Sequence, residues 1–60
     1  MQPVKKILIV EDEDALLRPL LSLFRQAGWR TEGAKDGEQG LIKLAKFKPD
    51  VMLLDIICLN

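Results

Sequence analysis

Residues 6–14 read KILIVEDED, and this stretch decides the fold. Its first part is largely β-branched and apolar, and it ends abruptly in a run of acids. That pattern is typical of a strand buried on both faces and followed by a loop. A strand of this kind belongs to a parallel sheet that helices cover on both sides. We therefore expect an α/β fold.

A helix is predicted to follow this strand. Apolar residues recur at helical spacing from Ala15 to Ala27, with Asp14 as a plausible N-cap and Gly28 as the C-terminal stop. Pro19 falls inside the helix one turn from its start, where we expect at most a bend. Residues 29–34 then predict a short second strand, and their alternation of polar and apolar residues suggests an edge position.

A second helix and a third strand complete the pattern. Asp36 can cap the helix, and Gln39 stands three residues on, as in a capping box. The predicted buried stripe of this helix consists of Leu41, Leu44, Ala45 and Phe47. Residues 49–50 break the helix, and the apolar run VMLL at 51–54 ends in Asp55. The expected order is βαβαβ, a doubly wound arrangement in which ligands bind beyond the carboxyl ends of the strands.

Composition narrows the classes of function. The 60 residues hold 9 basic and 9 acidic side chains, so the zero net charge predicts no long-range attraction to nucleic acid or anionic lipid. A single cysteine, Cys58, and no histidine exclude an internal disulfide and a Cys/His zinc site. No stretch reads as a signal peptide or a membrane span. We expect one cytoplasmic unit with no direct nucleic-acid or membrane partner.

The remaining conspicuous side chains predict packing or solvation instead of chemistry. The aromatic residues Phe24, Trp29 and Phe47 are expected in the core. The lysines of the second helix, Lys43, Lys46 and Lys48, are expected on its solvated face.

Three acids are the candidates for chemistry. Glu11 and Asp12 follow the first strand and Asp55 closes the third, so they converge on one edge if these strands are neighbours. A hard divalent cation relieves their repulsion, and Mg²⁺ suits oxygen ligands. Beside such a metal, Asp55 could act as a nucleophile toward a phosphoryl group. Structural interpretations stay open, because acids before a helix often serve as caps and Asp55 could form a turn.

In these motifs the sequence resembles the receiver domains of bacterial two-component response regulators. Residues 7–13, ILIVEDE, resemble the family's first strand and acidic pair. Residues 34–37, AKDG, resemble its second-helix entry, and residues 49–56, PDVMLLDI, resemble its phosphoacceptor strand. The resemblance runs from about residue 5 to residue 57. It implies a partial flavodoxin-like fold with a parallel sheet of order 2-1-3, and a signalling module that is not an enzyme.

The resemblance also implies roles for individual residues. Asp55 would accept a phosphoryl group from a phosphohistidine on a sensor histidine kinase. Asp12 would bind Mg²⁺ directly, Glu11 mainly through water, and the backbone carbonyl of Ile57 would be a further ligand. A phosphatase with an aspartyl nucleophile is set aside, because Ile57 stands where such enzymes carry a second acid.

The matched residues correspond to the N-terminal half of a receiver domain, so we expect residues 1–60 to be that part. The family's fourth and fifth strands carry a hydroxyl and a lysine that contact the phosphoryl group, and their absence here predicts a poor phosphoacceptor. The third strand would also be an open apolar edge that invites self-association. The alternative function is therefore an interaction or self-assembly module without phosphotransfer, whether truncated or engineered.

Overall fold

The sheet is built around its first strand, as the sequence predicts. The computed structural model describes residues 4–54, and its elements are β1 (Lys6–Val10), α1 (Asp14–Gln26), β2 (Arg30–Ala34), α2 (Gly37–Phe47) and β3 (Val51–Leu54). Both β2 and β3 pair with β1 in parallel, which gives the strand order β2-β1-β3. The expected βαβαβ unit with order 2-1-3 is confirmed.

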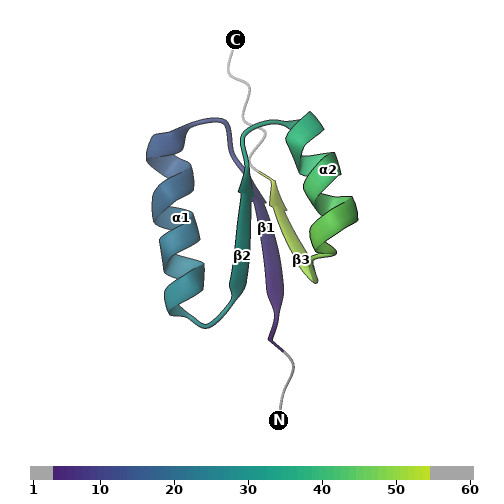
Figure 1. The fold of residues 1–60 in the computed structure, drawn as a ribbon. Helices are drawn as coiled ribbons and strands as arrows, with labels where there is room; N and C mark the ends of the chain where they lie inside the picture. The colour runs from purple at the N-terminus through teal and green to yellow at the C-terminus, as the bar shows by residue number, and fades with distance from the viewer. Residues whose placement is uncertain (1–3, 55–60) are drawn as a thin grey trace.

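The two helices lie on opposite sides of the sheet (Figure 1). Because side chains alternate along a strand, β1 contributes to two cores. Ile7 and Ile9 pack with Leu17 of α1, whereas Leu8 and Val10 pack with Ala34 and face α2. All four of these β1 side chains are buried, which explains why the strand carries no polar residue between Ile7 and Val10.

Helix α1 begins one residue earlier than the sequence suggests. Its N-cap is Glu13, not Asp14, and no side chain caps it; Glu13 instead accepts hydrogen bonds from two helical N–H groups through its own carbonyl. The helix runs through Pro19 to Gln26. Gly28 follows with φ +96°, a conformation that L side chains rarely adopt, so it ends the helix as predicted.

Helix α2 begins at the predicted cap. The Gln39 N–H donates to Asp36 Oδ1 at 2.7 Å, while Gln39 Oε1 accepts from the Lys35 N–H at 3.2 Å. The side chain thus reaches one residue beyond the position that a capping box would use. The helix ends at Lys48, which takes the left-handed conformation with φ +52°.

The predicted buried stripe of α2 is wrong for Leu41, Leu44 and Ala45, and only Phe47 packs against the core. Leu41 and Leu44 are exposed, and the buried residue of this helix is Gly40. A Cβ at Gly40 would lie 3.2 Å from Val10 Cγ2, so the missing side chain lets the helix approach β1 closely. The sheet therefore contacts the face that holds Gly40, and the leucines point elsewhere.

Two other expectations concern the remaining side chains. Phe24, Trp29 and Phe47 pack at the margins of the two cores as expected, and Phe24 meets Trp29 edge to face at 5.9 Å. Lys43 is not simply solvated: it is half-buried, donates to the Gly33 carbonyl and lies 3.4 Å from the Glu32 carboxylate. Lys43 therefore ties α2 to β2.

Strand β3 is an edge of the sheet within residues 4–54. It pairs with β1 alone, and Val51, Leu53 and Leu54 are each more than a third exposed. The predicted open apolar edge is therefore present in this part of the chain.

Candidate functional site

The carboxyl ends of β1 and β3 finish side by side. Val10 is the register partner of Leu54, the last residue that the structure describes. Glu11 follows Val10, and its N–H donates to the Ala34 carbonyl at 2.9 Å, which extends the pairing with β2 by one residue. Strand β1 thus delivers the acidic segment to a fixed point between its neighbours. Asp55 and Ile57 lie outside the described residues.

Glu11 and Asp12 sit in different surroundings although they are adjacent in sequence. Glu11 is 3% exposed, and its Oε1 accepts a hydrogen bond from the Glu13 N–H at 3.1 Å. Asp12 is exposed. One carboxylate is therefore sheltered and held by the loop backbone, while the other faces solvent. Together they offer the hard oxygen donors that Mg²⁺ prefers, at the end of a buried strand.

The described acids do not by themselves form a complete metal centre. Among residues 4–54, no three acidic, cysteine or histidine side chains are grouped so that they could hold a metal ion. Two of the four predicted ligands, Glu11 and Asp12, lie within this range, and the other two lie beyond it.

Some of the neighbouring acids have structural roles. Asp14, in the first turn of α1, forms a 3.1 Å salt bridge with Lys35, which precedes α2. Both side chains are more than half exposed, so this pair contributes little to stability, about 0–1 kcal/mol. Asp36 caps α2. The capping role is thus correct for Asp36, whereas Asp14 is not a cap and instead pairs with Lys35 from the first turn of α1.

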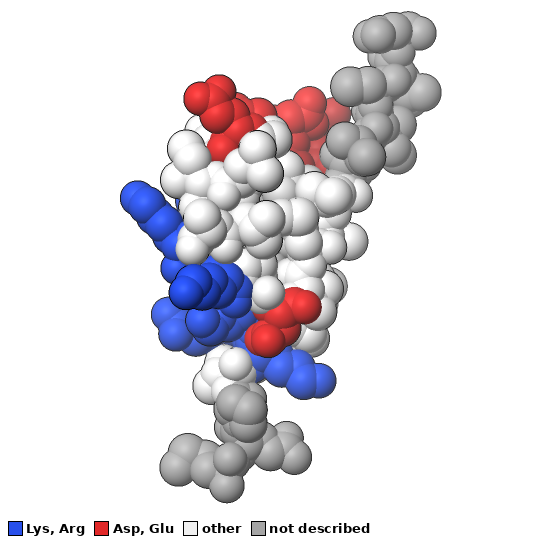
Figure 2. Space-filling model, turned by 90° about the vertical axis from the view of Figure 1, so that its right-hand side faces the viewer, with Lys and Arg blue, Asp and Glu red and all other residues white. Residues whose placement is uncertain are grey.

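The charges of the chain are sorted between its two ends, which the zero net charge conceals. In Figure 2 the acids gather at the end where the strands finish, and lysine and arginine gather near the opposite end. The acidic end holds Glu11, Asp12, Glu13, Asp14, Asp36 and Glu38, with Lys35 among them. The basic end holds Lys5, Lys6, Arg25, Arg30, Lys46 and Lys48, with Asp50 among them.

This sorting follows partly from the helices, because acids favour helix N-termini and bases favour C-termini. The net charge of zero, summed over the whole chain, conceals it. The sorting of charges could have been predicted from the parallel strands, which all begin at one edge of the sheet, because Lys5, Lys6 and Arg30 stand at strand starts. The expectation concerned a long-range field, and the charges at each end act only locally, within about 10 Å at 0.1 M salt.

Comparisons with known proteins identify the family. The response regulator receiver domain matches residues 7–58. Transcriptional regulatory protein TrcR of Mycobacterium tuberculosis is 38% identical over 52 residues, which are 87% of this chain and 20% of that protein. Regulatory protein AtoC of Escherichia coli is 41% identical over 56 residues, 93% of this chain and 12% of that protein.

A third relative gives the same picture. The alkaline phosphatase synthesis transcriptional regulatory protein PhoP of Bacillus subtilis is 38% identical over 53 residues, 88% of this chain and 22% of that protein. The chain therefore spans between 12% and 22% of the length of these relatives. Solved structures gave no significant match. Within residues 4–54, neither helix is long and apolar enough to cross a membrane.

Proposed function

The chain belongs to the response regulator receiver domain family of two-component systems, and from this premise we propose that Asp55 accepts a phosphoryl group from a sensor histidine kinase. One observation carries the proposal: β1 and β3 pair in parallel with Val10 opposite Leu54. The residues that follow them in sequence are Glu11 and Asp55. This register supports the convergence of the predicted metal ligands and the predicted nucleophile on one edge.

Mg²⁺ is the proposed cofactor, bound by Asp12, by Glu11 mainly through water, by Asp55 and by the backbone carbonyl of Ile57. The Glu11 carboxylate is buried and accepts from the Glu13 N–H, which suits a ligand that acts through an ordered water. The exposed Asp12 carboxylate suits direct contact with a metal that keeps several waters.

The proposed reaction uses the Asp55 carboxylate as the nucleophile. One carboxylate oxygen attacks the phosphorus of the phosphohistidine, the P–N bond breaks, and the kinase imidazole leaves with the electron pair. Mg²⁺ supplies charge neutralisation on the phosphoryl oxygens when it is bound. The product is an aspartyl phosphate.

Labelling with a small phosphoryl donor tests this function. The chain is incubated with radiolabelled acetyl phosphate and Mg²⁺. We expect label at low stoichiometry, because residues 1–60 are predicted to be a poor phosphoacceptor, and hydroxylamine should remove it. Asp55→Asn should carry none, and chelation of the metal should abolish labelling. Asp36→Asn is the matched control, because asparagine also caps a helix and the fold should be kept.

Two outcomes contradict phosphotransfer at Asp55. Label on Asp55→Asn at the wild-type level would move the acceptor elsewhere. Absence of label on the wild type, with far-UV circular dichroism showing the folded protein, would exclude phosphotransfer. Self-association through β3 would then be the remaining candidate function.

Self-association through β3 is the second candidate function. Val51, Leu53 and Leu54 are exposed on a strand that pairs on one side only, and unpaired strand edges bind other strands. Sedimentation should show association that persists in high salt. Leu53→Lys should abolish it, while Leu23→Lys, at an exposed leucine on α1, should not. A monomer at all concentrations would exclude this function.

A further inference from the structure

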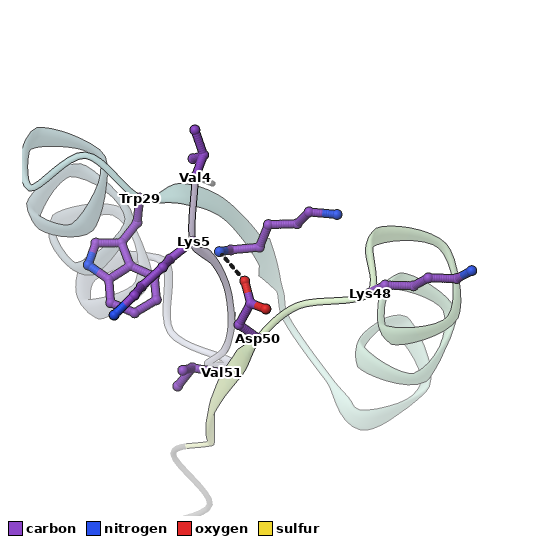
Figure 3. A pocket seen from close by; sticks show the side chains of 7 residues that line it. Val4, Lys5, Trp29, Lys48, Asp50 and Val51 are labelled. Carbon is purple, nitrogen blue, oxygen red and sulfur yellow. Dashed lines mark hydrogen bonds between the residues drawn. The ribbon is translucent and has the colours of Figure 1, made fainter. Parts of the chain in front are cut away.

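A pocket opens at the end of the sheet opposite the acidic edge. It has a volume of about 740 Å³ and is lined by Val4, Lys5, Lys6, Trp29, Lys48, Asp50 and Val51 (Figure 3). A volume of this size lies in the range of pockets that hold small molecules, about 300–1,000 Å³. The proposed phosphotransfer does not use this pocket, and the β3 edge shares Val51 with it.

Lys6 and Asp50 form the frame of the pocket. The Lys6 N–H donates to Asp50 Oδ2 at 2.9 Å, and the Asp50 N–H donates to the Lys6 carbonyl at the same distance. Lys6 Nζ donates to the Phe47 carbonyl at 3.1 Å and lies 5.5 Å from the centre of the Phe47 ring. These two charged side chains are therefore engaged with the protein itself.

On the side of Asp50 where Trp29 lies, Lys5 supplies the positive charge that a ligand would meet. Its Nζ lies 5.7 Å from the centre of the Trp29 ring, and it forms no salt bridge within residues 4–54. Figure 3 shows Lys5, Trp29 and Val51 on one side of Asp50, with Lys48 on the other side and directed away from Trp29. The cation and the aromatic ring thus share one wall.

The same wall is apolar apart from Lys5. Val51 is 45% exposed at the start of β3, and Trp29 is half-buried with its ring edge to face with Phe24. Exposed apolar surface beside an ammonium group that forms no salt bridge with residues 4–54 suits a ligand that combines a flat apolar body with an anionic group. A plain inorganic anion would leave the apolar surface uncovered.

We propose that this pocket binds a small organic anion with a flat apolar body. The carboxylate or phosphate of the ligand pairs with Lys5 Nζ, and the apolar body contacts Trp29 and Val51. Lys48, on the far side of Asp50, contributes only to the general positive field. The site is independent of phosphotransfer, so Asp55→Asn should bind the ligand as the wild type does.

Fluorescence of the chain reports binding directly, because Trp29 is its only tryptophan and it has no tyrosine. Titrations use phenylacetate, its uncharged counterpart phenylacetamide, and acetate, which lacks the ring. Phenylacetate should give a saturable change in emission. The other two should bind about tenfold more weakly or worse, because each lacks one half of the recognition.

Three lysine variants locate the site. Lys5→Gln should weaken phenylacetate binding about tenfold, in line with the loss of one charge-assisted contact. Lys48→Gln should change it about threefold at most, and Lys46→Gln, outside the pocket, should not change it. All three side chains are exposed, so circular dichroism should show the same fold.

Several outcomes overturn the proposal. They are equal affinity for phenylacetate and phenylacetamide, unchanged binding in Lys5→Gln, or equal losses in all three variants. A change in emission that follows protein concentration and not ligand concentration would indicate association between copies of the chain near Val51, and would reject a small ligand.

Discussion

Replacing Gly40 by alanine tests how closely α2 must approach β1. A Cβ at Gly40 would lie 3.2 Å from Val10 Cγ2, closer than ordinary contact. Gly37, the first residue of the same helix, has nothing within 4 Å of its built Cβ. The two glycines are therefore a matched pair: both are in the first turn of α2, and only one is crowded.

The two substitutions should change the free energy of unfolding in opposite directions. Alanine is better than glycine in a helix by about 0.5–1 kcal/mol, so Gly37→Ala should stabilise by up to about that amount. At Gly40 the same gain is opposed by overpacking, which costs about 1–3 kcal/mol. Val10 cannot easily turn aside, because its β-branched side chain is stiff at χ1. Gly40→Ala should therefore lower the free energy of unfolding by about 0–2 kcal/mol.

Urea unfolding followed by far-UV circular dichroism measures both variants. Combination with Val10→Ala gives the decisive control, since a smaller residue at position 10 removes the crowding. In that background Gly40→Ala should stabilise as Gly37→Ala does. If Gly40→Ala stabilises the wild-type chain to the same degree as Gly37→Ala, the close approach of α2 to β1 does not constrain this fold.

Three further substitutions test other parts of the fold by the same measurement. Leu8→Ala removes a fully buried side chain and should lower the free energy of unfolding by about 2–5 kcal/mol. That is a large share of the total free energy of unfolding, about 3–9 kcal/mol for a domain of this size. Leu23→Ala, at an exposed site, should cost little. Gly28→Ala should cost about 1–2 kcal/mol, because φ is +96° there; a neutral effect would show that the turn rearranges. Asp36→Ala should cost about 1 kcal/mol and Asp36→Asn much less, and equal losses would argue against a capping role.

The strands and their order could be predicted because short apolar runs bounded by polar residues leave a simple pattern, although only β1 is buried on both faces. The runs in β1 and β3 are continuous and apolar, and parallel crossovers admit few arrangements. The cap at Asp36 was also predictable, since its partner Gln39 is three residues away. These features depend on local sequence or on a general rule of chain topology.

The orientation of α2 could not be predicted from periodicity alone. Its apolar residues mark a helix, but which face meets the sheet depends on how near the helix axis comes. Gly40 sets that distance, and a glycine gives no hydrophobic signal. Lys43 was misjudged for a related reason, because a long side chain can reach back to the Gly33 carbonyl of β2.

The candidate site was predictable only in outline. The adjacency of β1 and β3 and the position of Glu11 are confirmed, whereas the roles of Asp55 and Ile57 stay predictions. The Lys5 and Trp29 wall was missed because its members come from separate segments and meet only in three dimensions.

The unequal pairing of the strands has a consequence for hydrogen exchange. Strand β1 is bonded on both sides and buried on both faces, so its amides should exchange slowest, through global unfolding. Strand β3 is held by β1 alone, and its pairing closes a loop of more than 40 residues, so it should detach first. Its opening would release Leu54 while the β1-α1-β2 unit stays folded. The exchange rate of β3 amides would then set how often the proposed acceptor strand is presented to another protein.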